Sequence, residues 1–456
     1  MTTAKQARNS EGKSGSLVAI ITMFFLFAMI SFVTNLAAPI GTIWKNHYEW
    51  AGMLGNLMNF LAYLFMGIPA GNMLVKYGYK KTALIALALG AIGMGIQLLS
   101  SYWGAGVDTF SVSGEPVELN YIIYLLGAFI CGFCVCMLNT VVNPMLNLLG
   151  GGGNKGNQLI QAGGSCNSLA GTLTPLFVGM LIGTVTPATA MSDVSPLMFI
   201  AMGVFVLAFI VIACVSIPEP HLQKKGAKKV AYTHSPWSFR HTVLGVVGIF
   251  FYVGIEVGIP GVLIFYLSDS KASGIEVNAT AVAGAVAAIY WLLMLVGRLT
   301  SSVISGKVSS RTQLIATSTA AIFLIVLAIV LPSSLRVSMP AYSVEEGFAM
   351  AQVPVSALML VLCGLCTSVM WGGIFNLAVE GLGKYTAQAS GIFMMMVVGG
   401  GVMPLIQNYI ATNVGYMVSY WLPVAMLAYL LFYAVAGSKN VNTDIPVEDD
   451  VDALNL

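Results

Sequence analysis

Charged residues are scarce in this chain of 456 residues: they make up only 8% of it, whereas 57% of its residues are hydrophobic. Soluble globular proteins carry roughly 25% charged residues, so the composition excludes an ordinary soluble protein and indicates one that is embedded mainly in lipid. A basic patch with interleaved aromatic residues is missing, which argues against a nucleic-acid partner. Nucleotide-binding loops and the common hydrolase motifs are missing too, so we expect no enzymatic activity and no bound cofactor.

Histidine and cysteine do not occur where they usually perform chemistry. The four His residues fall in loops or at the ends of hydrophobic segments, so the sequence offers no histidine proton relay inside the membrane. All seven Cys residues lie within hydrophobic segments, whereas a disulfide framework would place them between segments. The closely spaced Cys131, Cys134 and Cys136 have no His or carboxylate nearby, so we interpret them as packing residues and expect no metal site.

Long hydrophobic segments dominate the sequence instead. Twelve segments of membrane-spanning length are centred near residues 30, 62, 91, 133, 173, 205, 255, 290, 322, 365, 399 and 427. They predict an all-α membrane protein with twelve transmembrane helices in two six-helix lobes. The predicted parts are an N-terminal lobe, a linker, a C-terminal lobe and an acidic, disordered tail, over residues 1–217, 218–242, 243–437 and 438–456. The loops at about 102–120 and 333–352 are expected to be solvated caps.

The distribution of basic residues predicts the orientation. With both termini in the cytoplasm, 16 of the 20 Lys and Arg residues face the cytoplasm and three lie in outer loops. Cytoplasmic segments of membrane proteins carry this excess of positive charge. We therefore expect a multi-pass protein of the cytoplasmic (inner) membrane with both termini inside, acting as a monomer.

An internal repeat supports the division into two lobes. Asn143 and Asn376 lie 233 positions apart, and Pro175 and Pro404 lie 229 apart. An offset close to half the chain length indicates a parallel repeat, which is typical of two-lobed transporters.

Several segments are similar to a known family. They are FFLFAMISFVTNLAAP from Phe24, IPAGNMLVKYGYKK from Ile68, LNTVVNPMLNLLG from Leu138, CNSLAG from Cys166 and GIFNLAVEGLG from Gly373. Together they resemble the major facilitator superfamily and, within it, the fucose/glucose–galactose:cation symporter family. The resemblance implies alternating access and a monosaccharide cargo. However, Asn35 and Asn139 occupy the places of the acidic residues of proton-coupled fucose symporters, so the resemblance does not extend proton coupling to this chain and favours sodium coupling or facilitated diffusion over proton symport.

Amide and aromatic side chains within the spans are the candidate cargo ligands. An amide offers two donors and an acceptor to sugar hydroxyls, although the same side chains also join helices to one another. Aromatic rings can stack on the apolar face of a sugar, although ordinary packing is the alternative. The candidates are Asn35, Asn139, Asn143, Gln161, Asn167, Tyr252, Trp371 and Asn376.

Glu256 is the one carboxylate deep within a span. A charge at this depth costs roughly 2.5–3.5 kcal/mol on insertion scales, which makes a functional role the first hypothesis. Glu256 is our candidate for the coupling cation, Na⁺ or H⁺, or for a bond to a cargo hydroxyl. The alternative is a structural pair with an amide or Tyr. We expect Glu380 to pair with Arg298 or to take part in the inner gate.

The sequence therefore predicts a secondary active transporter for a monosaccharide such as fucose, glucose or galactose, with cation-coupled uptake. Another carrier of the superfamily, such as a drug exporter or an anion exchanger, is one alternative. A transporter-like sugar sensor is another. A membrane-embedded enzyme would need paired catalytic groups, whereas Glu256 stands alone among the span residues.

Overall fold

The computed structural model describes residues 2–48, 54–112, 114–182, 190–219, 234–276, 279–343 and 347–447. The first half of the chain contains the helices α1 (Thr2–His47), α2 (Leu54–Leu99), α3 (Leu119–Leu149), α4 (Gly153–Ile182) and α5 (Ser195–Cys214), with the strands β1 (Asp108–Val112) and β2 (Glu115–Glu118). The second half contains α6 (Arg240–Ser268), α7 (Ser270–Ser273), α8 (Ala279–Ile304), α9 (Ser310–Val330), β3 (Arg336–Ser343), β4 (Gly347–Pro354), α10 (Val355–Thr367), α11 (Met370–Val379), α12 (Thr386–Met395), α13 (Gly399–Asn413), α14 (Tyr416–Ser419) and α15 (Trp421–Phe432).

These elements form twelve membrane-spanning segments. In the described part of the chain, ten helical stretches are long and apolar enough to cross a membrane, and the 46-residue α2 counts as one of them although it is broken at Gly78 into two spans. The polar α4, with 30 residues, is the remaining span. Helices α10 and α11 together form one span, as do α12 and α13. The predicted fold class is thus confirmed.

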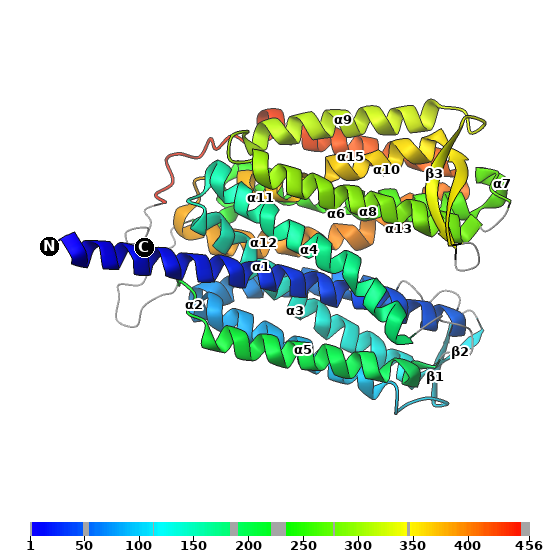
Figure 1. The fold of residues 1–456 in the computed structure, drawn as a ribbon, viewed down its shortest axis with the longest axis horizontal. Coiled ribbons are helices and arrows are strands. Elements are labelled where there is room, and N and C mark those ends of the chain that lie inside the picture. Colours follow the sequence, from blue (N-terminus) through cyan, green and yellow to red (C-terminus); the bar gives the residue numbers. More distant parts are fainter. Residues whose placement is uncertain are drawn as a thin grey trace.

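The spans form two lobes that lie side by side, with α5 at the edge of one and α9 at the edge of the other (Figure 1). We call α1–α5 the N-lobe and α6–α15 the C-lobe. The start of α1 lies at one end of the molecule, here called the terminal face, and both strand pairs lie at the opposite end, the hairpin face (Figure 1). The predicted linker lies mostly outside the described residues.

The two loops that we expected to be solvated caps are antiparallel hairpins. Strand β1 pairs with β2 from Asp108↔Glu118 onward, and β3 pairs with β4 from Arg336↔Pro354 onward. In the second hairpin Met339, Ala341 and Val353 are buried and belong to the hydrophobic core. The prediction was wrong there because alternate side chains of this hairpin pack against helices α8 and α10.

The prediction of a disordered tail was also wrong for its first part. Ile445 and Val447 pack against a small cluster formed by Phe239, Leu382, Tyr385 and Ala389 on the terminal face. The Oδ1 atom of Asn442 also accepts a hydrogen bond from the backbone N–H of Arg240 at 3.0 Å. Residues 448–456 lie outside the described residues.

The break within α2 depends on Gly78 and Glu219. Gly78 has φ 83° and ψ 173°, a backbone conformation that is essentially restricted to glycine. The turn leaves the N–H groups of Tyr79 and Lys80 at the start of the third span, and both donate to the Glu219 carboxylate. Burial raises the pKa of Glu219, and these two hydrogen bonds with the nearby Lys80 and Lys81 act in the opposite direction. The contact fixes the turn to the end of the sixth span.

We predict that Gly78→Ala lowers the stability of the protein by about 1–3 kcal/mol, because the residue would be strained and its Cβ would displace Glu219. Gly203→Ala is the matched control, since Gly203 lies inside α5 and a Cβ there meets nothing within 4 Å. Thermal unfolding of both purified variants in detergent measures the effect. Equal melting temperatures for the two variants would contradict this account of the turn.

Candidate functional site

Three of the predicted residues meet between the lobes. Trp371, on α11, donates from its indole Nε1–H to Oδ1 of Asn143, on α3, at 3.0 Å. The Tyr252 ring, on α6, lies 6.2 Å from the Trp371 ring. Asn143 and Tyr252 are fully buried, whereas Trp371 is partly accessible. An amide and an aromatic ring from opposite lobes therefore face one another between the lobes.

Closer to the terminal face, amide side chains join the lobes directly. Asn147 donates to Oδ1 of Asn376 at 2.7 Å, and Asn157 donates to the hydroxyl of Ser305 at 3.3 Å. Gln161 donates to the carbonyl of Val369 at 2.8 Å, at the break between α10 and α11. We call this set of lobe-bridging hydrogen bonds the terminal gate.

A proline adds one more contact to the terminal gate. Pro144 has no N–H, so the carbonyl of Thr140 one turn earlier loses its helical partner. That carbonyl accepts a hydrogen bond from Ser390 of α12, in the other lobe, at 3.3 Å. Close packing accompanies it, because Gly67 of α2 and Gly391 of α12 approach so nearly that a Cβ on either would clash with the backbone of the other.

These contacts define the state of the molecule. The lobe-bridging hydrogen bonds described above all lie in the half of the spans that is nearer the terminal face. Helices α4 and α8, which pack together in that half, separate toward the hairpin face (Figure 1). The lobes are therefore closed against each other at the terminal face.

Glu256 forms an ion pair that we did not predict. Its Oε1 atom lies 3.1 Å from a guanidinium nitrogen of Arg298, on α8 of the same lobe. The expectation that Glu380 pairs with Arg298 was therefore wrong: α6 and α8 pack together and bring Glu256 to Arg298, whereas Glu380 is exposed at the end of α11. The Glu256 side chain is 15% exposed, so it stays partly accessible in this state.

The remaining predicted residues bond within the N-lobe. Asn139 donates to the Tyr63 hydroxyl at 2.8 Å, and Asn167 donates to the carbonyl of Phe27 at 3.0 Å. Asn35 donates to the carbonyl of Ser31 in its own helix at 2.8 Å. Asn35 and Asn167 are partly accessible, whereas Asn139 is buried. Of the predicted amides, only Asn35 and Asn167 are thus accessible in this state, and Gln161 and Asn376 are part of the terminal gate.

Sequence reasoning missed several partners of these residues. Asn147 lies four positions after Asn143 and therefore on the same face of α3, so helical spacing alone could have identified it. Ser305 and Ser390 carry no comparable signal, because serines are frequent in these spans and only packing selects the two that reach the other lobe.

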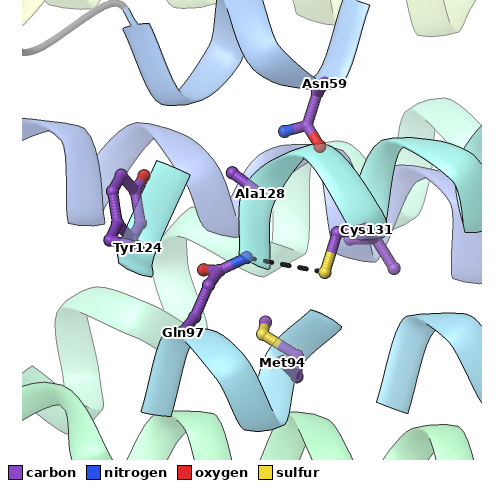
Figure 2. A pocket seen from close by; sticks show the side chains of 7 residues that line it. Asn59, Met94, Gln97, Tyr124, Ala128 and Cys131 are labelled. Atoms are coloured by element: carbon purple, nitrogen blue, oxygen red, sulfur yellow. Dashed lines mark hydrogen bonds between the residues drawn. The ribbon is translucent and has the colours of Figure 1, made fainter. Parts of the chain in front are cut away.

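A separate polar pocket lies inside the N-lobe. Asn59 and Gln97 of α2 and Tyr124 of α3 approach it, and Gln97 donates to the Cys131 sulfur at 3.5 Å (Figure 2). Its volume of about 10 Å³ suits a single water molecule, and the Asn59 Oδ1 and Tyr124 hydroxyl atoms have no protein partner there. The pocket is too small for a sugar and is not part of the surface between the lobes.

Comparison with known proteins agrees with this architecture. A family model described as Major Facilitator Superfamily matches residues 19–403. A glucose/galactose transporter of Brucella abortus is 28% identical over 431 residues, covering 93% of this chain and 94% of that protein. A putative glucose/galactose transporter of Helicobacter pylori is 29% identical over 445 residues, covering 93% and 96%.

A crystal structure of the Escherichia coli fucose:proton symporter has a similar fold. It superposes with a TM-score of 0.71 at 19% sequence identity, covering 92% of this chain and all of that one.

We predict that Asn147→Ala opens the terminal gate, because it leaves the buried Oδ1 of Asn376 without its donor. An unsatisfied buried group costs about 1–3 kcal/mol, which corresponds to a population change of about 5-fold to 150-fold. Spin labels are attached at Lys155→Cys and Lys307→Cys, which are exposed positions next to the ends of α4 and α8. Double electron–electron resonance measures the distance between the two labels, which increases when the gate opens. The labelled protein also carries Cys166→Ala and Cys214→Ala, because these two native cysteines are not buried and would otherwise react with the spin label.

Asn413→Ala is the control for this measurement. Asn413 is exposed at the hairpin face and donates to Tyr409 in its own helix, so its loss should leave the distances unchanged. Identical distance distributions for the two variants would show that the Asn147–Asn376 bond does not hold the gate.

Proposed function

Because the chain belongs to the major facilitator superfamily, we propose that it carries a neutral monosaccharide across the cytoplasmic membrane by alternating access, as a monomer and with cation-coupled uptake. The observation that carries the proposal is the meeting of Asn143, Trp371 and Tyr252 between the lobes. Amides recognise hydroxyl groups, and a partly accessible indole offers its face to the C–H side of a sugar ring.

The relatives make glucose and galactose the first cargo candidates, since one is named a glucose/galactose transporter and the other a putative glucose/galactose transporter. A sugar would first reach the partly accessible Asn35, Asn167 and Trp371. The buried Asn143 would take part once its bond to Trp371 is exchanged for a bond to cargo. The bias of basic residues supports a cytoplasmic terminal face, which makes the present state the one that accepts cargo from outside.

We favour a proton over sodium as the coupling cation, with Glu256 as its acceptor. One oxygen of Glu256 already faces the Arg298 guanidinium, and a sodium ion on the same carboxylate would lie within a few ångströms of that charge. A bound proton brings the same charge beside Arg298, so the preference rests on coordination: a sodium ion needs several oxygen ligands, whereas one Glu256 oxygen is already occupied by the guanidinium. A proton instead forms a covalent bond with the carboxylate oxygen and needs no further ligands.

The alternatives fit the charges less well. An anion carrier needs a positive group that is free to bind cargo, whereas Arg298 is neutralised by Glu256. A drug exporter and a sugar sensor remain alternatives that transport measurements separate, because the first would move apolar compounds outward and the second would bind sugar without moving it.

We expect proteoliposomes containing the protein to take up labelled glucose or galactose, and to accumulate it when the outside is more acidic than the inside. The measurement compares a panel of monosaccharides, with fucose and a sugar alcohol included, under proton, sodium and no gradient. Saturable sugar binding without flux would identify a sensor, and flux of none of the sugars would refute the proposed cargo.

We further predict that Trp371→Ala raises the KM for the transported sugar about tenfold, whereas Trp371→Phe raises it only a few fold. Both variants lose the bond to Asn143, so the difference between them isolates the aromatic ring, for which stacking contributes about 0.5–1.5 kcal/mol. Trp291→Ala is the control, because Trp291 is 42% exposed on α8. Equal KM values for the Ala and Phe variants would exclude stacking by this ring.

A further inference from the structure

A groove lies in the C-lobe between the ends of α6 and α13 that reach the hairpin face, where α7 follows α6 (Figure 1). Its volume of about 440 Å³ is within the range of small-molecule pockets, which is roughly 300–1,000 Å³. The groove is therefore large enough for a monosaccharide, unlike the polar pocket inside the N-lobe. It is lined by Phe265, Ser268, Asp269, Asn408, Thr412 and Tyr416.

The groove begins where a close contact between the two helices ends. A Cβ on Gly254 would press into the Met403 side chain of α13. A Cβ on Gly258 would likewise press into the Gln407 side chain, so α6 and α13 pack closely at these two positions. Nearly one turn further along α6, a Cβ on Gly261 would meet no atom within 4 Å. The two helices thus leave space between them from Gly261 to the hairpin face.

The groove opens toward the space between the lobes. Gly401, on α13, faces the side chains of Leu57 and Phe60 on α2, in the N-lobe. Asn408 follows Gly401 by seven residues, which is nearly two helical turns, so it lies on the same side of α13. Because the lobes are closed only toward the terminal face, a solute that enters between them from the hairpin face passes this groove first.

The groove is separate from the meeting of Asn143, Trp371 and Tyr252 between the lobes, here called the central site. Tyr252 and Ser268 both lie on α6, 16 residues apart. This separation corresponds to about 24 Å along a helix. One monosaccharide is too short to reach both places, so the groove and the central site would bind sugar one after the other.

Asp269 presents a fixed carboxylate oxygen to the groove. Its Oδ1 atom accepts hydrogen bonds from the backbone N–H groups of Lys271 at 3.0 Å and Ala272 at 3.2 Å, which hold the carboxylate in place at the start of α7. Among the described residues, its Oδ2 atom has only the Tyr416 hydroxyl beside it, at 3.5 Å. This distance is the limit of a hydrogen bond, so Oδ2 is available as an acceptor.

The other polar groups of the groove are available as well. The Asn408 amide and the Ser268 hydroxyl make no hydrogen bond to any described residue, and both side chains are partly accessible. The ring of Tyr416 is partly accessible and lies 5.8 Å from the Tyr266 ring, which supports it from one side. A carboxylate, an amide, a hydroxyl and an aromatic ring thus line one space.

This combination fits a neutral sugar better than an ion. A carboxylate accepts strong hydrogen bonds from hydroxyl groups, an amide offers both donors and an acceptor, and an aromatic ring packs against a C–H face. An anion would be repelled by Asp269. A single metal ion would find one free carboxylate oxygen in a space many times its own size, because Oδ1 is already occupied by two N–H groups.

We propose that the groove is an entry site, which binds the transported monosaccharide at the hairpin face before the sugar reaches the central site. Asp269 accepts hydrogen bonds from sugar hydroxyls, Asn408 completes the polar contacts, and Tyr416 packs against the ring. The inference rests on the proposed function for the identity of the sugar.

The test measures how fast a maleimide reacts with Thr412→Cys, at an exposed position of the groove, in the full chain in lipid nanodiscs. The protein also carries Cys166→Ala and Cys214→Ala, as for the spin labels. We expect glucose or galactose to slow the reaction, because a bound sugar covers the thiol, and a sugar alcohol without a ring to leave it unchanged. Asn413→Cys, exposed on the adjacent position of α13, is the control and should react equally fast with and without sugar.

Asp269→Asn separates the ligand role of the carboxylate from its structural role. Asn still caps a helix start well, so α7 should keep its hydrogen bonds. The sugar concentration that gives half of the protection should rise about tenfold, because a bond to a charged oxygen is lost. Asp193→Asn is the matched control, since Asp193 accepts from the N–H of Ala190 at 2.9 Å before α5 and should change nothing. Asn408→Ala should also weaken the protection, and it provides a second test if Asp269→Asn does not fold.

Trp371→Ala distinguishes the entry site from the central site. Protection of Thr412→Cys should persist in this variant, because the groove does not contain Trp371. Protection that is lost with Trp371→Ala but unchanged in Asp269→Asn would show that closure of the lobes covers the thiol, and it would overturn the proposal.

The remaining outcomes keep the two proposals apart. Sugar uptake by proteoliposomes without any protection of Thr412→Cys would refute the entry site and leave the proposed function intact. Protection that depends on Asp269 in a protein that moves no sugar would support the groove as a sugar site and refute transport of that sugar.

Discussion

Polar groups inside a membrane protein must find partners, and this requirement governs the structure. The Glu256–Arg298 ion pair shows it most clearly, because both members are charged. Moving an isolated charge into such an environment costs several kcal/mol, so each of the two charges depends on the other. The pair also fixes the guanidinium at the boundary between the lobes. From there it donates to the Gly164 carbonyl and the Ser168 hydroxyl of α4, in the other lobe.

The same requirement explains where the neutral contacts between the lobes form. Two of them use main-chain carbonyls at irregular points of a helix, namely Thr140 beside Pro144 and Val369 between α10 and α11. The Thr140 oxygen has no helical partner because Pro144 lacks an N–H, whereas the Val369 oxygen accepts from Gln161 in addition to the N–H of Gly373 in its own segment. Pro144 therefore supplies an acceptor for the opposite lobe, and a serine side chain is sufficient to bind it. Such contacts are individually weak, which suits a surface that must separate in every transport cycle.

The spans could be predicted from sequence because lipid imposes a length and a composition that single segments display. Asn143 and Trp371 could be chosen as candidate cargo ligands for a similar reason, since polar and aromatic residues are easily recognised in apolar spans. The partner of Glu256 was not predictable, because it depends on how α6 and α8 rotate against each other. The second hairpin was missed because its alternation is confined to a short segment in which Met339 and Val353 turn inward.

The packing of residues 438–447 against the terminal face has a practical consequence for handling the protein. Ile445 and Val447 pack against a cluster that includes Tyr385, just before α12, and Ala389 within α12, the helix that also carries Ser390. A purification tag or fluorescent protein fused directly after Val447 would thus press on the helix that closes the lobes. Shortening the chain before Asn440 would strip an apolar cover from the same place, so recombinant versions of the protein should preserve this segment and carry any fusion at the opposite end of the chain.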